Sequence, residues 1–413
     1  MSIPLSSPDI GEREIEYVIQ VLRSGHLSLG PRVSEFEERF AAWVGTRYAV
    51  ATNSGTSALH LCVKAMGIGP EDEVLTTSFS FVASANCLLY ERALPTFVDI
   101  NNATLNLDPA ALAETIARDC TWERVRSRLI NRRSGRVVKA ILPVHVFGLP
   151  CEMAPILEIA RAFNLCVLED ACEALGAEYA RQRVGTIGDA AAFAFYPNKQ
   201  MTTAEGGMIV TNNPQIAGVC RSLRNQGRDE DCQWLRHVRL GFNYRLSDLH
   251  CALGIAQLER LDEILSARAR IAAAYCHGLS GIPEITLPQH YPHLHRSWFV
   301  FVVQVGGGLG DPQAESLRNI LATGLRERGI ASQIYFPPIH RQPYYRESSS
   351  TVPPALPRTE SAAGRCLALP FFSAMTESQV SEVCDAVRGI VFDARVRLEP
   401  MLLRGAADDL AAD

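Results

Sequence analysis

The sequence predicts an α/β fold built on a mostly parallel sheet, and two features of the chain support this. Short apolar runs alternate with amphipathic helical segments through the first two-thirds of the 413 residues, which is typical of a sheet wrapped by helices. The runs are continuously apolar rather than alternating, as expected for strands that are covered on both faces. We therefore expect a large α/β domain over residues 14–258.

Each strand of this domain is expected from one apolar run. The runs are EVLTT from residue 73, LPTFVDI from 94, VKAILPVHVFG from 138, LCVLED from 165, AAAFAFY from 190 and GMIVTN from 207. Helical patterns separate them, for example at residues 56–67 and 152–163. In the first of these, Leu59, Cys62 and Met66 recur at helical spacing and Gly67 is a suitable end.

The last third of the chain predicts a smaller α+β domain over residues 259–398, with residues 1–13 packing nearby. A long helical pattern at 248–279 leads into it. A strand at 298–305, a helix at 315–329, a strand at 331–336 and a closing helix at 376–390 follow. The tail over residues 399–413 is rich in alanine and aspartate and is expected to be disordered.

The charge balance and the start of the chain exclude several classes of protein. The 40 basic and 45 acidic residues give a net charge of −5, so no basic surface for nucleic acid or an anionic membrane is expected. The first residues hold no apolar signal core, and no run approaches the roughly 18 apolar residues of a membrane span. We therefore expect a cytoplasmic protein with neither nucleic acid nor membrane as partner.

Cysteines and histidines give no sign of disulfides or of a metal. The 12 cysteines are scattered singly through apolar runs, such as Cys62 in ALHLCVKAM, which favours reduced and mostly buried thiols. The densest histidine cluster, HYPHLH at residues 290–295, lies among prolines. An ordinary loop is the better interpretation there, and no metal is predicted.

Two segments of small polar and acidic residues are candidate ligand sites. Residues 53–59, NSGTSAL, place small polar residues and a glycine where a helix begins, and free amides at a helix start bind phosphate. Taken alone, an ordinary N-cap explains them better.

Residues 168–173, LEDACE, place carboxylates at the carboxyl end of an apolar strand, where ligand sites of α/β sheets gather. A helix-capping acid is an equally good interpretation.

Two further segments complete the set. Lys199 follows a buried strand in the run FAFYPNKQMTTAEGG, and a lysine near apolar or cationic groups can form a Schiff base. By residue type alone, a surface lysine remains the better interpretation. Residues 241–248, GFNYRLSD, precede the long helical pattern, and a buried polar turn or cap explains them in isolation.

Together and in this order, the four segments resemble the sugar-nucleotide aminotransferases of the DegT-like family. The resemblance extends from about residue 3 to residue 390 and includes SFSFVASAN, LEDACEALGAEY, FYPNKQMTTAEGGMIVT and FNYRLSDLHCALGIAQLERLD. That family has the type I aminotransferase fold and uses pyridoxal 5'-phosphate (PLP), which passes through the pyridoxamine form during turnover. The resemblance implies a large domain with a mostly parallel seven-stranded sheet and a smaller C-terminal α+β domain.

The resemblance also implies roles for individual residues. Lys199 matches the lysine that forms the Schiff base with PLP and then shuttles a proton. Asp170 matches the acid that pairs with the pyridine nitrogen, which keeps the ring an electron sink. Glu173 falls where relatives often carry glutamine or histidine near the phenolic oxygen, and Phe81 matches the aromatic residue that stacks on the ring.

The remaining matches concern the phosphate and the assembly. Gly55 and Thr56 match the backbone phosphate site. Asn243 matches an asparagine that reaches the cofactor phosphate of the neighbouring subunit, which implies a homodimer with shared active sites. Ala194 departs from the family, because relatives commonly have a serine there whose hydroxyl binds the phosphate.

The implied activity is transfer of an amino group, from L-glutamate, to a 3-keto or 4-keto deoxysugar nucleotide. The aminosugar product would enter a surface polysaccharide or a glycosylated metabolite. Substrate contacts are expected from the loop FPPIHRQPYYRE, including His340 and Tyr344. The alternatives are a dehydratase of the same family and a non-enzymatic regulatory member. Dehydratases replace the lysine with histidine, and retention of Lys199, Asp170 and the phosphate site speaks against both alternatives.

Overall fold

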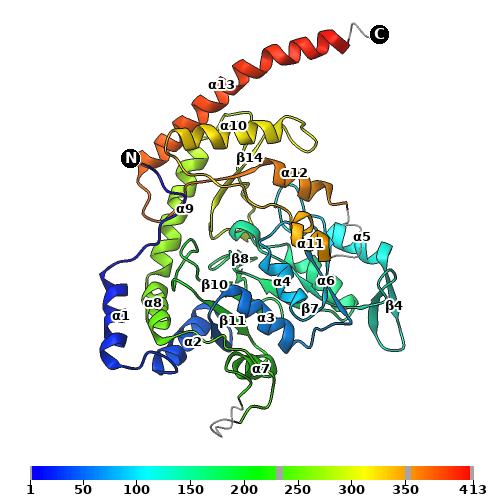
Figure 1. Ribbon diagram of the computed structural model, residues 1–413, viewed down its shortest axis with the longest axis vertical. Coiled ribbons are helices and arrows are strands. Elements are labelled where there is room, and N and C mark those ends of the chain that lie inside the picture. The colour runs from blue at the N-terminus through cyan, green and yellow to red at the C-terminus, as the bar shows by residue number, and fades with distance from the viewer. Residues whose placement is uncertain (1, 229–235, 349–354, 410–413) are drawn as a thin grey trace.

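The computed structural model describes residues 2–228, 236–348 and 355–409, with side chains described as far as residue 395. Within these residues, a central path of seven strands lies in the order β1-β11-β10-β7-β6-β2-β3, surrounded by helices (Figure 1). The strands of this path are β1 Tyr48–Thr52, β2 Asp72–Thr77, β3 Leu94–Val98, β6 Val137–Leu142, β7 Cys166–Asp170, β10 Ala190–Ala194 and β11 Gly207–Thr211.

The direction of these strands confirms the prediction of a mostly parallel sheet. The pairs from β10 through β7, β6 and β2 to β3 are all parallel, and only β11 runs antiparallel to its neighbours β10 and β1. All six strands expected from apolar runs are present. Strand β1 and a hairpin, β4 Cys120–Glu123 with β5 Arg128–Asn131, were not predicted. The hairpin sequence CTWERVRSRLIN has four charged residues among its twelve, and they interrupt any long apolar run.

Helices cover both faces of the sheet, as the alternation of buried side chains along its strands demonstrates. Val50 and Ala192 pack in a core with α3, whereas Ala49 and Phe193 pack in another with α2 and α8. The helices of this part of the chain are α1 Glu12–Ser24, α2 Pro31–Val44, α3 Gly55–Ala65, α4 Ala83–Leu89, α5 Pro109–Asp119, α6 Met153–Ala162, α7 Pro214–Arg224 and α8 Asp248–Glu259.

A separate core forms in the last third of the chain, where α9, α10 and α13 lie together at one end of the molecule (Figure 1). They cover a three-stranded antiparallel sheet of β12, β14 and β15. Ile3 joins this core and pairs with Ile330. The elements are α9 Leu261–Gly278, β12 Ile285–Thr286, β14 Phe301–Val305, α10 Ala314–Glu327, α11 Pro343–Ser348, α12 Pro357–Arg365, β15 Cys366–Leu369 and α13 Glu377–Asp409.

The short elements that remain lie between the two cores. They are a small sheet of β8 Glu178–Tyr179, β9 Gln182–Arg183 and β13 Leu294–His295, and the 3-10 turns η1 Val146–Gly148 and η2 Ile339–Arg341. The division of the chain between residues 258 and 259 stays a proposal. Among the described residues, no helix has the length and apolar character needed to cross a membrane.

Two predicted elements differ from the structure. The helix expected over 248–279 is divided at Arg260, whose backbone leaves helical geometry and whose side chain pairs with Asp9 and Glu14. The strand expected over 331–336 contains only an isolated bridge from Gln333, because the chain leaves the sheet before two prolines that lack an N–H donor. Of the tail over 399–413 that was expected to be disordered, residues 399–409 continue helix α13, and residues 410–413 lie outside the described residues.

Candidate active site

A cavity of about 480 Å³ lies at the carboxyl ends of β7 and β10, within the size range of ligand pockets. The start of α3 and the segment before α4 form one side of it, and the chain after β10 forms another. Its lining includes Ser54, Gly55, Thr56, Ser80, Phe81, Ser84, Asp170, Cys172, Glu173, Ala194, Tyr196, Asn198, Lys199, Phe299, Tyr335 and Phe336. Three of the four segments selected from the sequence therefore meet in one cavity.

Lys199 enters this cavity from a tight turn after β10. Its backbone N–H donates to the Tyr196 carbonyl at 2.9 Å, and its own carbonyl accepts from the buried Arg268 of α9 at 3.0 Å. The side chain is only 13% exposed, and its amino nitrogen lies 3.7 Å from a Glu173 oxygen. The same nitrogen lies 3.7 Å from the centroid of the Phe299 ring. Lys199 is thus a largely buried lysine and not a surface charge.

Asp170 and its neighbour Glu169 have opposite orientations, as adjacent residues of a strand do. Asp170 faces the cavity, where its carboxylate accepts from the Ser84 hydroxyl at 2.7 Å and from the Cys172 amide at 3.1 Å. Glu169 points away and pairs with His145. Burial raises the pKa of Glu169, but the His145 hydrogen bond and backbone amides outweigh it and leave this pKa lowered. Glu169 is therefore structural.

Glu173 is the second carboxyl of the cavity. One of its oxygens accepts from the backbone amide of Phe147 at 2.9 Å, and the other faces Lys199. Burial raises the pKa of Glu173 above its usual range, although the Lys199 ammonium opposes this. The Phe147 backbone has φ 56°, a left-handed conformation that aromatic residues rarely adopt. In this conformation the Phe147 amide donates to Glu173 and holds its side chain in position.

The start of α3 borders the cavity opposite Lys199. Ser54 caps the helix by accepting from the Ser57 amide, and the first intrahelical bond runs from Ala58 to the Ser54 carbonyl at 3.0 Å. The amides of Gly55 and Thr56 lie before this first bond, so the helix itself provides no acceptor for them. A Cβ atom on Gly55 would come within 2.6 Å of the Ala194 Cβ and 2.9 Å of the Cys172 sulfur, so only glycine fits.

Aromatic rings enclose the remaining sides. Phe81 is 60% exposed although it is a large apolar residue, and it faces the cavity from the loop after β2. Phe299, Tyr335 and Phe336 come from the last third of the chain. An exposed ring on one side of an otherwise buried cavity is a suitable surface for a flat ligand.

Comparison with known proteins agrees with this arrangement. The sequence model of the DegT/DnrJ/EryC1/StrS aminotransferase family matches residues 8–388. The chain belongs to this family. It is accordingly a PLP-dependent aminotransferase. This confirms the resemblance inferred from the sequence motifs.

Individual relatives match this aminotransferase over nearly its whole length. It is 37% identical to GDP-perosamine synthase of Caulobacter vibrioides over 93% of this chain and 97% of that protein. It is 36% identical to the spore coat polysaccharide biosynthesis protein SpsC of Bacillus subtilis over 94% of this chain and 97% of that protein. The PLP form of the putative sugar aminotransferase Spr1654 from Streptococcus pneumoniae superposes with a TM-score of 0.84 at 25% identity. The match covers 95% of this chain and 99% of that chain.

The residues of the cavity fit PLP. A lysine amine, a strand-end carboxylate and the amides at a helix start provide partners for an aldehyde, a ring nitrogen and a phosphate. The Asn198 amide oxygen is buried without a hydrogen-bond partner among the described residues, and it belongs to the cavity lining. The missing Cβ of Gly55 leaves room beside Ala194 and Cys172. When bound, PLP supplies an electron sink for a carbanion.

Other residues selected from the sequence lie outside the cavity. Asn243 is exposed and pairs with Asn225 in a short bridge, so it does not line the cavity of its own chain. His340 is buried, where its ring contacts the Ser78 hydroxyl and Glu360. Tyr344 donates to Asn86 at 2.6 Å. Neither His340 nor Tyr344 is among the lining residues.

The sequence interpretation missed several lining residues. Ser84 and Asn198 lie inside motifs that were recognised, next to residues that were selected, and their small polar side chains could have been noted. Phe299, Tyr335 and Phe336 lie in apolar segments that predict only strands. Their place in the cavity follows from the packing of the last third of the chain against the sheet.

Proposed function

We propose that this aminotransferase moves the amino group of L-glutamate to the ketone carbon of a 3-keto or 4-keto deoxysugar nucleotide. Glutamate leaves as 2-oxoglutarate, and the sugar nucleotide leaves with an amine in place of its ketone oxygen. The observation that carries this proposal is the buried Lys199 amine between Asp170, Glu173 and the start of α3. Similarity to GDP-perosamine synthase over 97% of that protein supports the sugar-nucleotide substrate.

Lys199 is assigned the covalent attachment of PLP and the transfer of a proton at the substrate carbon. Its turn is fixed by Tyr196 and Arg268, so the amine has a defined position. Because Phe299 and Glu173 surround the amine, little water reaches it. A positioned group in a dry site is well suited to general base catalysis.

Asp170 is assigned to the protonated pyridine nitrogen. The Ser84 hydroxyl and the Cys172 amide each donate to one of its oxygens, which orients the carboxylate before any ligand binds. A fixed negative charge at this point holds the proton on the ring nitrogen and thereby stabilises charge that develops on the ring.

Phe81 and Glu173 are assigned to the ring itself. The exposed face of Phe81 offers a stacking surface. The raised pKa of Glu173 allows its carboxyl to keep a proton that it can share with the phenolic oxygen. The glutamate at this position is therefore compatible with the role that glutamine or histidine has in relatives.

Gly55 and Thr56 are assigned to the cofactor phosphate, and this leads to a prediction for Ala194→Ser. The Ala194 Cβ borders Gly55, so a serine hydroxyl would point at the same phosphate. A hydrogen bond to a charged group contributes about 1.5–3 kcal/mol, and the Kd for PLP should fall roughly tenfold or more. Equilibrium dialysis of the apoenzyme measures this. Ala192→Ser, two residues earlier in β10, is the control and should not lower the Kd.

We further propose a homodimer with shared active sites. An exposed apolar surface runs along α1 and the segments that flank it, and a groove of about 350 Å³ connects this surface to the Lys199 turn at Pro197 and Ala204. Contiguous exposed apolar side chains of this kind are typical of protein–protein interfaces. Its large exposed side chains are Ile10, Ile15, Ile19, Leu22, Leu27 and Leu29. A partner on this surface would lie beside the active site.

Mixing two inactive variants tests the shared site. Chains carrying Lys199→Ala are mixed with chains carrying Asn243→Ala, under conditions of confirmed subunit exchange. If each site takes Lys199 from one chain and Asn243 from the other, every heterodimer has one intact site. Random exchange then restores activity toward about a quarter of wild type.

The mixing experiment requires that Asn243→Ala is impaired by itself. Removing a donor to a phosphate is expected to cost about 1.5–3 kcal/mol, so a clear loss should be measurable. If the heterodimers form and activity does not rise above the sum of the two variants, Asn243 acts within its own chain.

The predicted cytoplasmic location stays a prediction.

The function is tested in two half-reactions. Addition of L-glutamate to the purified holoenzyme should change the cofactor absorption to that of the pyridoxamine form, with release of 2-oxoglutarate. A panel of 3-keto and 4-keto deoxysugar nucleotides is then screened for recovery of the original absorption. Recovery with a keto acid but with no sugar nucleotide of the panel would contradict the proposed substrate class and leave the aminotransferase activity intact.

A further inference from the structure

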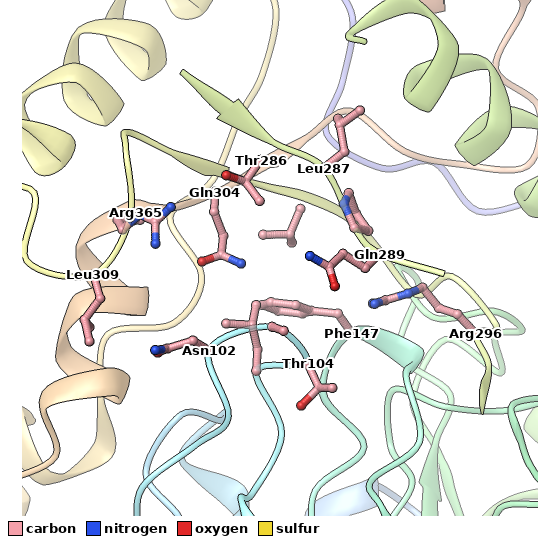
Figure 2. A pocket seen from close by; sticks show the side chains of 15 residues that line it. Asn102, Thr104, Phe147, Thr286, Leu287, Gln289, Arg296, Gln304, Leu309 and Arg365 are labelled. Atoms are coloured by element: carbon pink, nitrogen blue, oxygen red, sulfur yellow. The ribbon is translucent and has the colours of Figure 1, made fainter. Parts of the chain in front are cut away.

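A second cavity, of about 290 Å³, has a lining that shares no residue with the active-site cavity (Figure 2). One wall is the loop of residues 102–105 after β3, together with Phe147 of η1. The opposite wall consists of Thr286 of β12 with the residues that follow it to 289, two residues of β14, and Arg365 at the end of α12. The cavity therefore joins the sheet domain to the last third of the chain.

The charge of this cavity is positive. Arg296 and Arg365 are in its wall, and no acidic residue is among its lining residues. Among the described residues, Arg296 has neither an ion pair nor a hydrogen bond; its guanidinium lies 5.1 Å from the Trp298 ring centroid, and Tyr291 and Cys276 are the titratable groups that act on it. Arg365 donates only to the carbonyls of Val305 and Gly306. Most of the donors of both arginines remain available.

Neutral polar groups complete the lining. Figure 2 shows the side-chain amides of Gln289 and Gln304 pointing into the space, with the Arg296 guanidinium beside Gln289 and the Phe147 ring on the opposite side. Amide N–H groups and guanidinium groups converging on one enclosed space are typical of oxyanion recognition.

A cation in this environment needs a counter-charge. Burial lowers the pKa of Arg296 to about 10, which still leaves it protonated at neutral pH. Placing a charge in a poorly solvated site without a partner is unfavourable. The Gly307 and Gln313 amides and the charge of Arg365 lower the pKa of the Asp311 carboxylate. Arg365 therefore already has a counter-charge nearby, whereas no carboxylate in the described part of the chain acts on Arg296. A bound anion would provide the missing charge.

We propose that this cavity binds a small oxyanion, such as a phosphate or a dicarboxylate. It is separate from the active site, because the Phe147 ring stands between them and stacks on Phe336 of the active-site lining at 5.3 Å. Its volume is at the lower limit for ligand pockets and suits a compact ion. The proposal does not depend on the identity of the sugar substrate.

Isothermal titration calorimetry of the holoenzyme with inorganic phosphate and, separately, with succinate tests the proposal. At least one probe should bind with one site per chain while the cofactor absorption stays unchanged, and the probe that binds distinguishes phosphate from carboxylate chemistry. Arg296→Gln should weaken binding by about tenfold or more, because charge-assisted hydrogen bonds are lost. Arg270→Gln, an exposed arginine on α9, should leave the Kd unchanged.

A second variant guards against effects of Arg296 on packing. Gln304→Glu has nearly the same shape and adds a negative charge to the cavity, so it should also weaken binding by about tenfold or more. Binding that is equally tight in both variants would overturn the assignment to this cavity. Absence of binding by either probe to the wild-type holoenzyme would overturn the proposal itself.

Discussion

Lys199→Ala is expected to abolish transamination while the protein keeps its fold. A single acid–base group contributes on the order of 10²–10⁴ to a rate, and Lys199 is assigned both the proton transfer and the covalent attachment. We therefore expect kcat to fall by about 10⁴ or more. The measurement is the release of 2-oxoglutarate from L-glutamate by enzyme reconstituted with PLP.

The fold should survive because the lysine makes few structural contacts. Its loss leaves the Glu173 carboxyl without a cation at 3.7 Å. The pKa of that group is already raised by burial, so it takes up a proton and does not remain a buried charge. Circular dichroism and the Tm of Lys199→Ala should therefore stay close to wild type.

Chemical trapping provides a direct control. The chain contains only three lysines, Lys64, Lys139 and Lys199. Lys64 pairs with Glu91 at 2.8 Å and Lys139 with Asp72 at 3.3 Å, and neither lines the cavity. Borohydride reduction followed by peptide mapping should find the pyridoxyl group on Lys199, and Lys64→Ala and Lys139→Ala should remain active. A label on either of the other lysines would end the assignment.

Asp170→Asn is the second variant with a large expected effect. It should bind PLP and lose turnover by about 10²–10³, the range observed when one pre-organised group that stabilises developing charge is removed. An amide has almost the shape of the carboxylate but no charge to hold the pyridine proton. Steady-state kcat and a PLP titration, measured on the same preparation, separate the loss of chemistry from the loss of binding.

Ser84→Ala is the matched control for Asp170→Asn. It removes one of the two donors to the carboxylate and keeps the charge, so the Cys172 amide still orients Asp170. We expect a smaller loss of kcat than in Asp170→Asn. A near-normal rate in Asp170→Asn would indicate that Asp170 only terminates its strand.

Motifs in which several residues act within one short segment could be predicted from the sequence. Gly55, Asp170 and Lys199 each follow a recognisable strand or begin a helix, and parallel strands bring their carboxyl ends to one edge of the sheet. Their convergence on one cavity therefore followed from local pattern and strand direction. The residue roles themselves stay proposals until the variants above are measured.

The sequence by itself determined the α/β class and the six apolar strands, because these depend on periodicity, and its motifs in their order resemble the aminotransferase family to which the chain belongs. Only the tertiary structure decided that Glu169 faces away while Asp170 faces the cavity, that Phe299 packs against Lys199, and that Arg296 lines a second cavity. Such contacts join residues far apart in the chain. The contacts of Phe299 and Arg296 depend on how the last third packs against the sheet, and no local pattern encodes that packing.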